Sequence, residues 1–318
     1  MKKIPLEPTL VGGYRFLFTN IVSIVGTMWF PTVLVLGAIV GAFYLVAPHA
    51  WLAGDFSNFR PEQTLTAPFW LARGAIFVAS VLAGSMIAVG LMRHALGLKQ
   101  STTFIYFSLG APVWRMLGAI LLGAVIMVVL GIICGVLVAL VAIFGATLIP
   151  HGYAVAGGII LGLIVVVAIF YTAFRLFFFL PAVVVAENRI GLGRSWSLGG
   201  GNFWRIFFVY LLVVVPVGFV AAVALEMTIL PVVISGAMRL PHQPSAREIL
   251  DFLRGLLPLL PIIATILILQ GIAVRGLLAG AIGSAYNAVT APPAEAATPA
   301  EATPPVEATP PADEAANI

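Results

Sequence analysis

Polar and charged side chains gather between residues 175 and 210 of an otherwise apolar chain. Arginine suits phosphate because its planar guanidinium can bind two oxygens at once. The start of a helix also offers free N–H groups to an anion. These residue types could form either a binding site for an anionic lipid headgroup or an anchor at a membrane interface. The candidate residues are Arg175, Glu187, Arg189, Arg194, Asn202 and Arg205.

Glu187 has two interpretations. It stands close to Arg189 and Arg194, so a charged pair would anchor a turn at the end of a helix. In the second interpretation, Glu187, Arg194 and Asn202 line a polar site for a lipid headgroup, and the helix that starts near Asn202 supplies further donors. The residue types leave both open.

The chain contains no familiar arrangement for catalysis or metal binding. There is no HExxH spacing and no G-x-S-x-G, and the glycine-rich stretch 191–201 is neither a P-loop nor a G-x-G-x-x-G. Cys134 is the only cysteine, which excludes an internal disulfide and a cysteine-based metal site. We therefore expect no enzyme, metal or cofactor.

Composition places the chain in a membrane. Of 318 residues, 61% are hydrophobic and only 9% are charged, against about 25% charged in soluble domains. Its apolar runs exceed the roughly 20 residues that cross a bilayer as a helix, and they lack the alternation of barrel strands. The net charge is +4, and the basic residues lie at the ends of these runs, a position typical of membrane proteins that does not indicate nucleic-acid binding.

These runs predict an all-α, polytopic transmembrane helical bundle. The expected spans are about 24–47, 71–96, 113–149, 154–185, 203–235 and 259–280. The third is longer than a bilayer is thick, so it must tilt or its ends must project. The stretch 150–158 is expected to break the chain between the third and fourth spans.

Shorter elements are expected at the membrane interface. Residues 1–23 read as a short interfacial helix; alternatively, they are the first turns of the first span. Residues 98–112 form a mildly amphipathic interfacial stretch. Ser245 and Glu248 have the spacing of a capping box, which predicts a short helix after them. We see no cleavable signal peptide, so the first span is expected to remain in the protein as a membrane helix.

Small and polar residues within the spans predict helix contacts. The pairs Gly37/Gly41 and Gly276/Gly280 have GxxxG spacing, which lets a neighbouring helix approach closely. Gln270 is expected to bond a neighbouring helix. Glu226 is either a functional group within the membrane or a residue at the outer interface.

Charge predicts the topology. Six spans place both termini on one side with eleven Lys and Arg, against five on the other. Because cytoplasmic loops carry the excess of positive charge, both termini are expected in the cytoplasm. We expect a membrane domain over 1–289 and a disordered Ala/Pro/Glu-rich cytoplasmic tail over 290–318, which is a candidate for binding a protein partner.

The two cytoplasmic connections resemble each other. Ser-Leu-Gly occurs at 108–110 and at 197–199, and Trp-Arg follows at 114–115 and at 204–205. Two interpretations stand: a repeated unit of span, interfacial element and span, or chance similarity, since Trp and Arg are common at interfaces.

Residues 181–204 also resemble a known family. The resemblance rests on Pro181, Glu187-Asn188, Arg194-Ser195-Trp196 and Gly201-Asn202-Phe203-Trp204. This run is similar to a six-helix bacterial membrane domain that occurs fused to glycerophosphoryl diester phosphodiesterases and in related uncharacterised membrane proteins. Gly193 departs from the alanine frequent in that family, and the soluble phosphodiesterase domain is missing. The resemblance implies a membrane module in the bacterial cytoplasmic (inner) membrane, without phosphodiesterase activity.

Two functions follow as hypotheses. The first is a non-catalytic membrane scaffold or regulatory module. The alternative is a lipid-handling or transport protein with an anionic headgroup site at the cytoplasmic interface. Membrane lipids are the expected partners in both.

Overall fold

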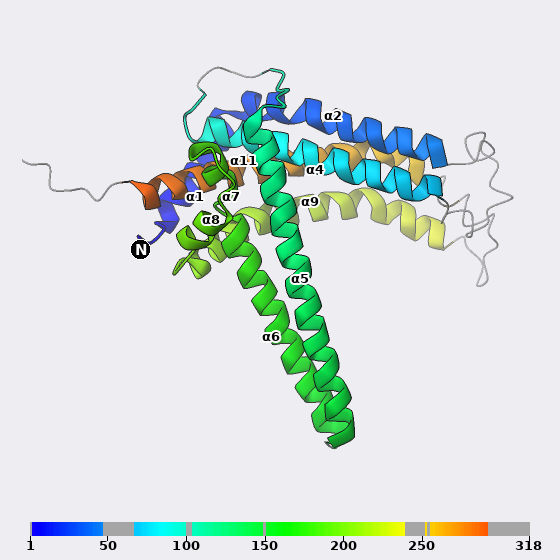
Figure 1. Ribbon diagram of the computed structural model, residues 1–318. Coiled ribbons are helices and arrows are strands. Elements are labelled where there is room, and N and C mark those ends of the chain that lie inside the picture. Colours follow the sequence, from blue (N-terminus) through cyan, green and yellow to red (C-terminus); the bar gives the residue numbers. More distant parts are fainter. Residues whose placement is uncertain are drawn as a thin grey trace, which may run out of the picture.

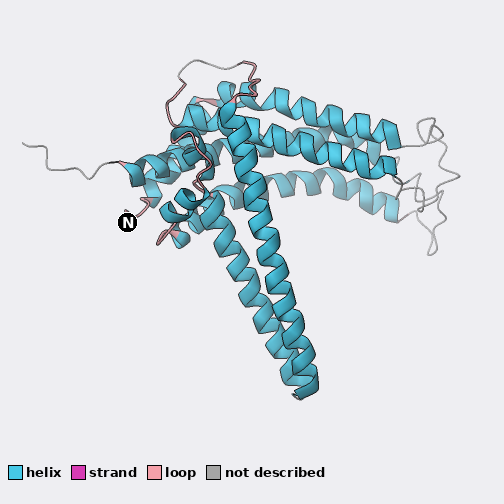
Figure 2. Ribbon diagram, viewed as in Figure 1, coloured by secondary structure: helices cyan, strands magenta, loops and turns pink. Residues whose placement is uncertain are grey.

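The computed structural model describes residues 2–46, 67–99, 104–148, 151–238, 252 and 255–291. Throughout this part the regular structure is helical, as Figure 2 shows, which confirms the predicted all-α class. Six of the helices described are long and apolar enough to cross a membrane. The chain is therefore a multi-pass integral membrane protein.

The long helices each correspond to a predicted span. They are α2 (Ile21–Val46), α4 (Ala67–Ala95), α5 (Ala111–Leu148), α6 (His151–Phe177), α9 (Phe203–Ala237) and α11 (Leu260–Thr290). The short elements are α1 (Leu6–Thr19), α7 (Leu180–Ala186), α8 (Leu192–Leu198) and the 3-10 turn η2 (Leu257–Leu259). Two boundaries were predicted too narrowly, since α4 begins at 67 instead of 71 and α11 ends at 290 instead of 280.

The helices form a bundle and a projecting hairpin. α2, α4, α9 and α11 run alongside one another, whereas α5 and α6 leave them together as a hairpin (Figure 1). α5 has 38 residues, or about 57 Å at 1.5 Å per residue, well over a hydrocarbon core of about 30 Å. The length of α5 thus matches the long span expected from the sequence, for which tilt or projection from the bilayer stays a prediction.

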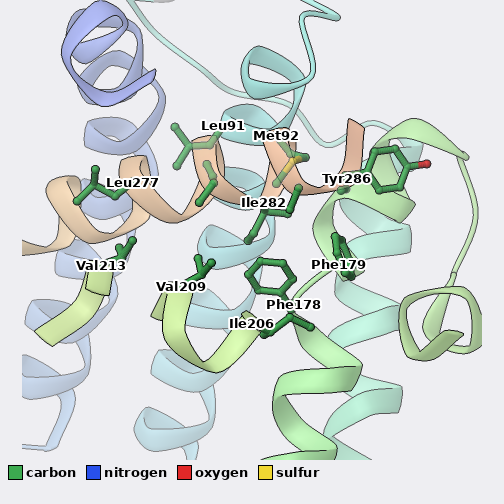
Figure 3. Packing of buried hydrophobic residues seen from close by; sticks show 14 of the residues in the cluster. Leu91, Met92, Phe178, Phe179, Ile206, Val209, Val213, Leu277, Ile282 and Tyr286 are labelled. Carbon is green, nitrogen blue, oxygen red and sulfur yellow. The ribbon is translucent and has the colours of Figure 1, made fainter. Parts of the chain in front are cut away.

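The buried core lies at the end of the bundle where the short helices gather. Phe178 and Phe179 are fully buried there, Ile206 and Ile282 lie next to Phe178, and Leu277 belongs to the same buried cluster (Figure 3). The two ends of the described chain meet at the same place, because Lys2 Nζ donates a hydrogen bond of 2.7 Å to the carbonyl of Ala291. An even number of spans places both ends on the same side of a membrane, which is compatible with this contact.

α1 is a helix of its own that packs across α11. The chain turns at Asn20, so the alternative that residues 1–23 begin the first span is wrong. A Cβ added at Gly280 would lie 3.0 Å from the Cα of Gly13, and one at Gly276 would lie 2.8 Å from Leu17 Cδ1. The Gly276/Gly280 pair thus permits close approach, as predicted, and the neighbour is α1.

Three other expectations differ from the structure. Nothing lies within 4 Å of a Cβ added at Gly37 or Gly41, so the close neighbour expected at this pair is wrong for the described part of the chain. α6 begins at His151, so 151–158 is helix rather than a break. The two connections also differ locally, because residues 192–198 form α8 whereas 104–110 form no helix.

Several expectations lie outside the described residues. They concern the capping box at Ser245 and Glu248 and the tail from 292 onward.

Candidate functional site

A break separates α6 from α7, and all the candidate residues except Arg175 follow it. Pro181 stands in the first turn of α7, where proline is tolerated because its missing N–H has no partner in the helix. The backbone turns at Phe178 and Phe179, whose rings are buried. The predicted span 154–185 is therefore two helices, and the second delivers Glu187 at its end.

Glu187 is the centre of a bonded cluster. Its Oε2 accepts hydrogen bonds from Arg189, one of them from Nε at 2.9 Å. Its Oε1 accepts from Arg194 Nε at 3.1 Å and from the hydroxyl of Tyr286 at 3.2 Å. This cluster ties the end of α7 to the start of α8 and to α11.

The electrostatics of Glu187 follow from these contacts. Burial alone raises the pKa of this carboxyl, but hydrogen bonds from Arg189, Arg194 and Tyr286 outweigh burial and hold the pKa below its ordinary value. The carboxylate is therefore ionised at neutral pH. It offsets part of the charge of Arg189 and Arg194, which are 60% and 44% exposed.

The turn after Glu187 receives a further contact. Asn188 has a left-handed backbone (φ 54°), which asparagine tolerates better than most residues. Its Oδ1 accepts a hydrogen bond from Arg115 Nη1 at the base of α5. The hairpin is thus joined to the same turn.

Arg175 holds α8 against the end of α6. Its Nε donates to the carbonyl of Trp196 at 3.1 Å and its Nη1 to the hydroxyl of Tyr171 at 2.8 Å. The guanidinium also lies 4.2 Å from the centre of the Trp196 ring, within the range of a cation–π contact. The buried hydroxyl of Ser195 donates to the carbonyl of Leu176 at 2.7 Å, which fixes the same packing.

Asn202 and Arg205 bind the N-terminal segment. Asn202 is buried; its Oδ1 accepts from the Ile4 N–H at 3.0 Å and its Nδ2 donates to the Lys2 carbonyl at 3.2 Å. Arg205 Nη1 donates to the Ile4 carbonyl. Asn202 precedes α9, yet its side chain makes no capping bond to that helix. Its polar atoms bond the distant backbone of residues 2–4 and, more weakly, the nearby carbonyls of Leu198 and Gly200.

The structure therefore places the six candidates in three groups. Glu187 gathers Arg189 and Arg194, Arg175 holds α8, and the pair Asn202 and Arg205 holds the N-terminus. Sequence reasoning missed Tyr286, Arg115 and the backbone of residues 2–4 as partners. Tyr286 carried a usable signal, because it is a polar aromatic residue close to the end of an apolar helix; the N-terminal backbone carried none.

The polar residues of the spans lie apart from these groups. Gln270 has no hydrogen-bonding partner among the described residues, which does not match the expected bond to a neighbouring helix. It lines an apolar groove of about 490 Å³ between α9 and α11 instead, together with Val217, Val220 and Leu269. Glu226 is exposed on α9.

Comparisons of the chain with protein-family models, with curated proteins and with solved structures found no match.

Proposed function

We propose that the chain is a non-catalytic membrane module that scaffolds or regulates partner proteins. The observation that supports this proposal is that all six candidate residues have partners within the chain. Polar groups bonded in this way fix a structure, whereas a site for substrate needs groups left available to it. In this proposal both termini are cytoplasmic, in a bacterial inner membrane.

The scaffold would present the C-terminal tail at a fixed position. Lys2 holds Ala291, and Asn202 and Arg205 hold the segment that carries Lys2. The Ala/Pro/Glu-rich sequence from 292 onward therefore starts beside the bonded groups. We assign the tail the role of binding a protein partner. The resemblance to the membrane domain of glycerophosphoryl diester phosphodiesterases is consistent with a module that works beside another activity.

The test compares native complexes in membranes. Full-length protein and a variant ending at residue 291 would be extracted in mild detergent and sized on native gels. We expect a complex larger than the monomer that loses its partner in the shortened variant. A full-length chain that migrates as a monomer, or that hydrolyses glycerophosphodiesters, would contradict the proposal.

A second candidate function is lipid handling, favoured by the apolar groove between α9 and α11. Mass spectrometry of co-purified lipids tests it directly. A single lipid class, enriched over the host membrane and lost in Arg194→Ala, would support the predicted headgroup site. A lipid profile that matches the bulk membrane would remove that support.

A further inference from the structure

A polar pocket lies beside α1, apart from the groups around Glu187. It opens between α1, the end of α4 and the last turns of α11, and its volume is about 350 Å³. We call it the α1 pocket. Its polar lining consists of Arg15, Thr19, Asn20, Ser284 and Asn287. We propose that the α1 pocket binds a phosphate group, either as the headgroup of a phospholipid or as a free phosphate.

Charge favours an anion in this pocket. The described part of the chain contains three carboxylates, Glu7, Glu187 and Glu226. Both ion pairs found in that part belong to Glu187, and Arg15 makes none there. Glu7 stands eight positions before Arg15 on α1, about 12 Å along the helix at 1.5 Å per residue. The guanidinium of Arg15 is thus exposed and unneutralised within this part of the structure.

The uncharged groups divide into fixed and available ones. Thr19 Oγ1 donates to the Arg15 carbonyl at 2.7 Å, and Ser284 Oγ donates to the Pro8 carbonyl at 3.3 Å. These bonds hold the walls of the pocket. The side-chain amide of Asn287 is exposed and makes no such bond to a described residue. Arg15 and Asn287 therefore face an incoming phosphate from α1 and α11 with free N–H donors, the chemistry that phosphate oxygens accept.

Two glycines, Gly12 and Gly280, let α1 pack closely against α11 beside the pocket. A Cβ at Gly12 would lie 2.9 Å from the Cβ and Oγ of Ser284, and one at Gly280 would lie 3.0 Å from the Cα of Gly13. Larger residues at these positions would push α1 off α11 and disrupt the pocket. The same close approach that joins the helices thus brings Arg15 and Asn287 into one lining.

An apolar groove begins at the next residue of the chain. Asn20 lines the α1 pocket, and Ile21 lines a groove of about 490 Å³ along α2 that Val25, Trp29 and Phe104 complete. A polar pocket and an apolar groove that start at one helix junction suit the two parts of a phospholipid. A free phosphate would use the pocket alone.

The test measures binding to detergent-purified, delipidated full-length protein. The probes are short-chain phosphatidylglycerol, short-chain diacylglycerol, which lacks the phosphate, and inorganic phosphate, and their binding is followed by native mass spectrometry and by thermal shift. Arg15→Gln removes the charge, Arg15→Lys keeps it, and Asn287→Asp adds a repelling carboxylate at an exposed position. Arg73→Gln is the matched control, because Arg73 lines a separate groove with Ile39 and Phe77.

We expect phosphatidylglycerol to bind the wild-type protein and the Arg73→Gln variant equally. Its affinity should fall at least about tenfold in Arg15→Gln and in Asn287→Asp, the scale of one charge-assisted hydrogen bond, with partial recovery in Arg15→Lys. Competition by inorganic phosphate at similar concentration assigns the site to a free anion, and failure to compete assigns it to lipid. Unchanged affinity in both variants, with melting temperatures like the wild type, overturns the proposal, as does equal binding of phosphatidylglycerol and diacylglycerol to the wild-type protein.

Discussion

The side chain of Asn202 bonds the backbone of Ile4, 198 positions earlier in the chain. Its Oδ1 accepts the Ile4 N–H at 3.0 Å, and its amide reaches the carbonyl of Lys2 at 3.2 Å. Ile4 is fully buried in the core beside Ile206. One side-chain amide thus satisfies two backbone groups, the Ile4 N–H and the Lys2 carbonyl, and holds the N-terminal segment in place.

Replacing Asn202 by alanine should release this N-terminal segment. The buried Ile4 N–H would lose its acceptor, and an unsatisfied buried donor costs about 1–3 kcal/mol. We expect a lower melting temperature in detergent and faster hydrogen exchange at residues 2–6. Asn287→Ala, which removes an exposed amide, is the control for loss of the side chain alone. Wild-type exchange at residues 2–6 in Asn202→Ala would show that other contacts hold the segment.

Glu187 should make stability depend on pH in the acidic range. The pKa of this carboxyl is lowered in the folded protein: burial raises it, and the bonds from Arg189, Arg194 and Tyr286 more than compensate. Its stabilising contribution is therefore complete above the ordinary glutamate pKa and is lost as pH falls through the lower folded value. The melting temperature should therefore fall as the pH is lowered below about 4.3, the ordinary pKa of glutamate.

The variant Glu187→Gln isolates that effect. It keeps one acceptor oxygen in place of the two that Arg189 and Arg194 bond separately. It carries no charge, so its melting temperature should be lower at pH 7 and should change less than that of the wild type between pH 5 and pH 3. Glu226→Gln serves as the control, because Glu226 is exposed on α9 and has no ion pair within the described residues. Equal acid sensitivity in Glu187→Gln and the wild type would contradict the assignment.

The six spans were predictable because span length and apolarity are local properties of the chain. The break at Phe178 and Phe179 was not, since Pro181 fits the first turn of a new helix as well as a kink in one that continues. The end of α11 was missed for a different reason. Residues 281–290 include buried side chains such as Ala281, Ile282 and Ala285, and such long-range packing leaves little trace in a hydropathy pattern.

In the candidate site, too, contacts between residues close in sequence were predicted and contacts between distant residues were not. Residue types alone brought Glu187 together with Arg189 and Arg194, because all three lie within eight positions of one turn. Tyr286 reaches the same carboxylate from 99 positions away, and Ile4 reaches Asn202 across most of the chain. The GxxxG spacing also marked Gly37/Gly41 and Gly276/Gly280 equally, although among the described residues only the second pair has a close neighbour. Spacing describes one helix face, and the presence of a partner depends on the whole fold.

Replacing Gly280 by leucine should separate α1 from α11. A Cβ at this position would already lie 3.0 Å from the Cα of Gly13 and from Phe16 Cγ, so a longer side chain forces the helices apart. Overpacking typically costs about 1–3 kcal/mol. Gly41→Leu is the matched control, because open space surrounds Gly41 within the described structure. The melting temperature should be lowered in Gly280→Leu and not in Gly41→Leu. Equal melting temperatures for the two variants would contradict the close packing of α1 on α11.

Replacing Arg175 by lysine should loosen α8 while keeping the positive charge. Lysine cannot offer both the Nε donor to the Trp196 carbonyl and the Nη1 donor to Tyr171. It also stacks less well on the Trp196 ring, which now lies 4.2 Å from the guanidinium. We expect a loss of about 1–2 kcal/mol, the sum of one charged hydrogen bond and part of a cation–π contact. Limited proteolysis between 187 and 202 should become faster than in Arg73→Lys, which makes the same substitution on α4. Because charge is conserved in both variants, a general electrostatic effect would accelerate cleavage in neither, whereas a role of the planar guanidinium in seating α8 requires the difference.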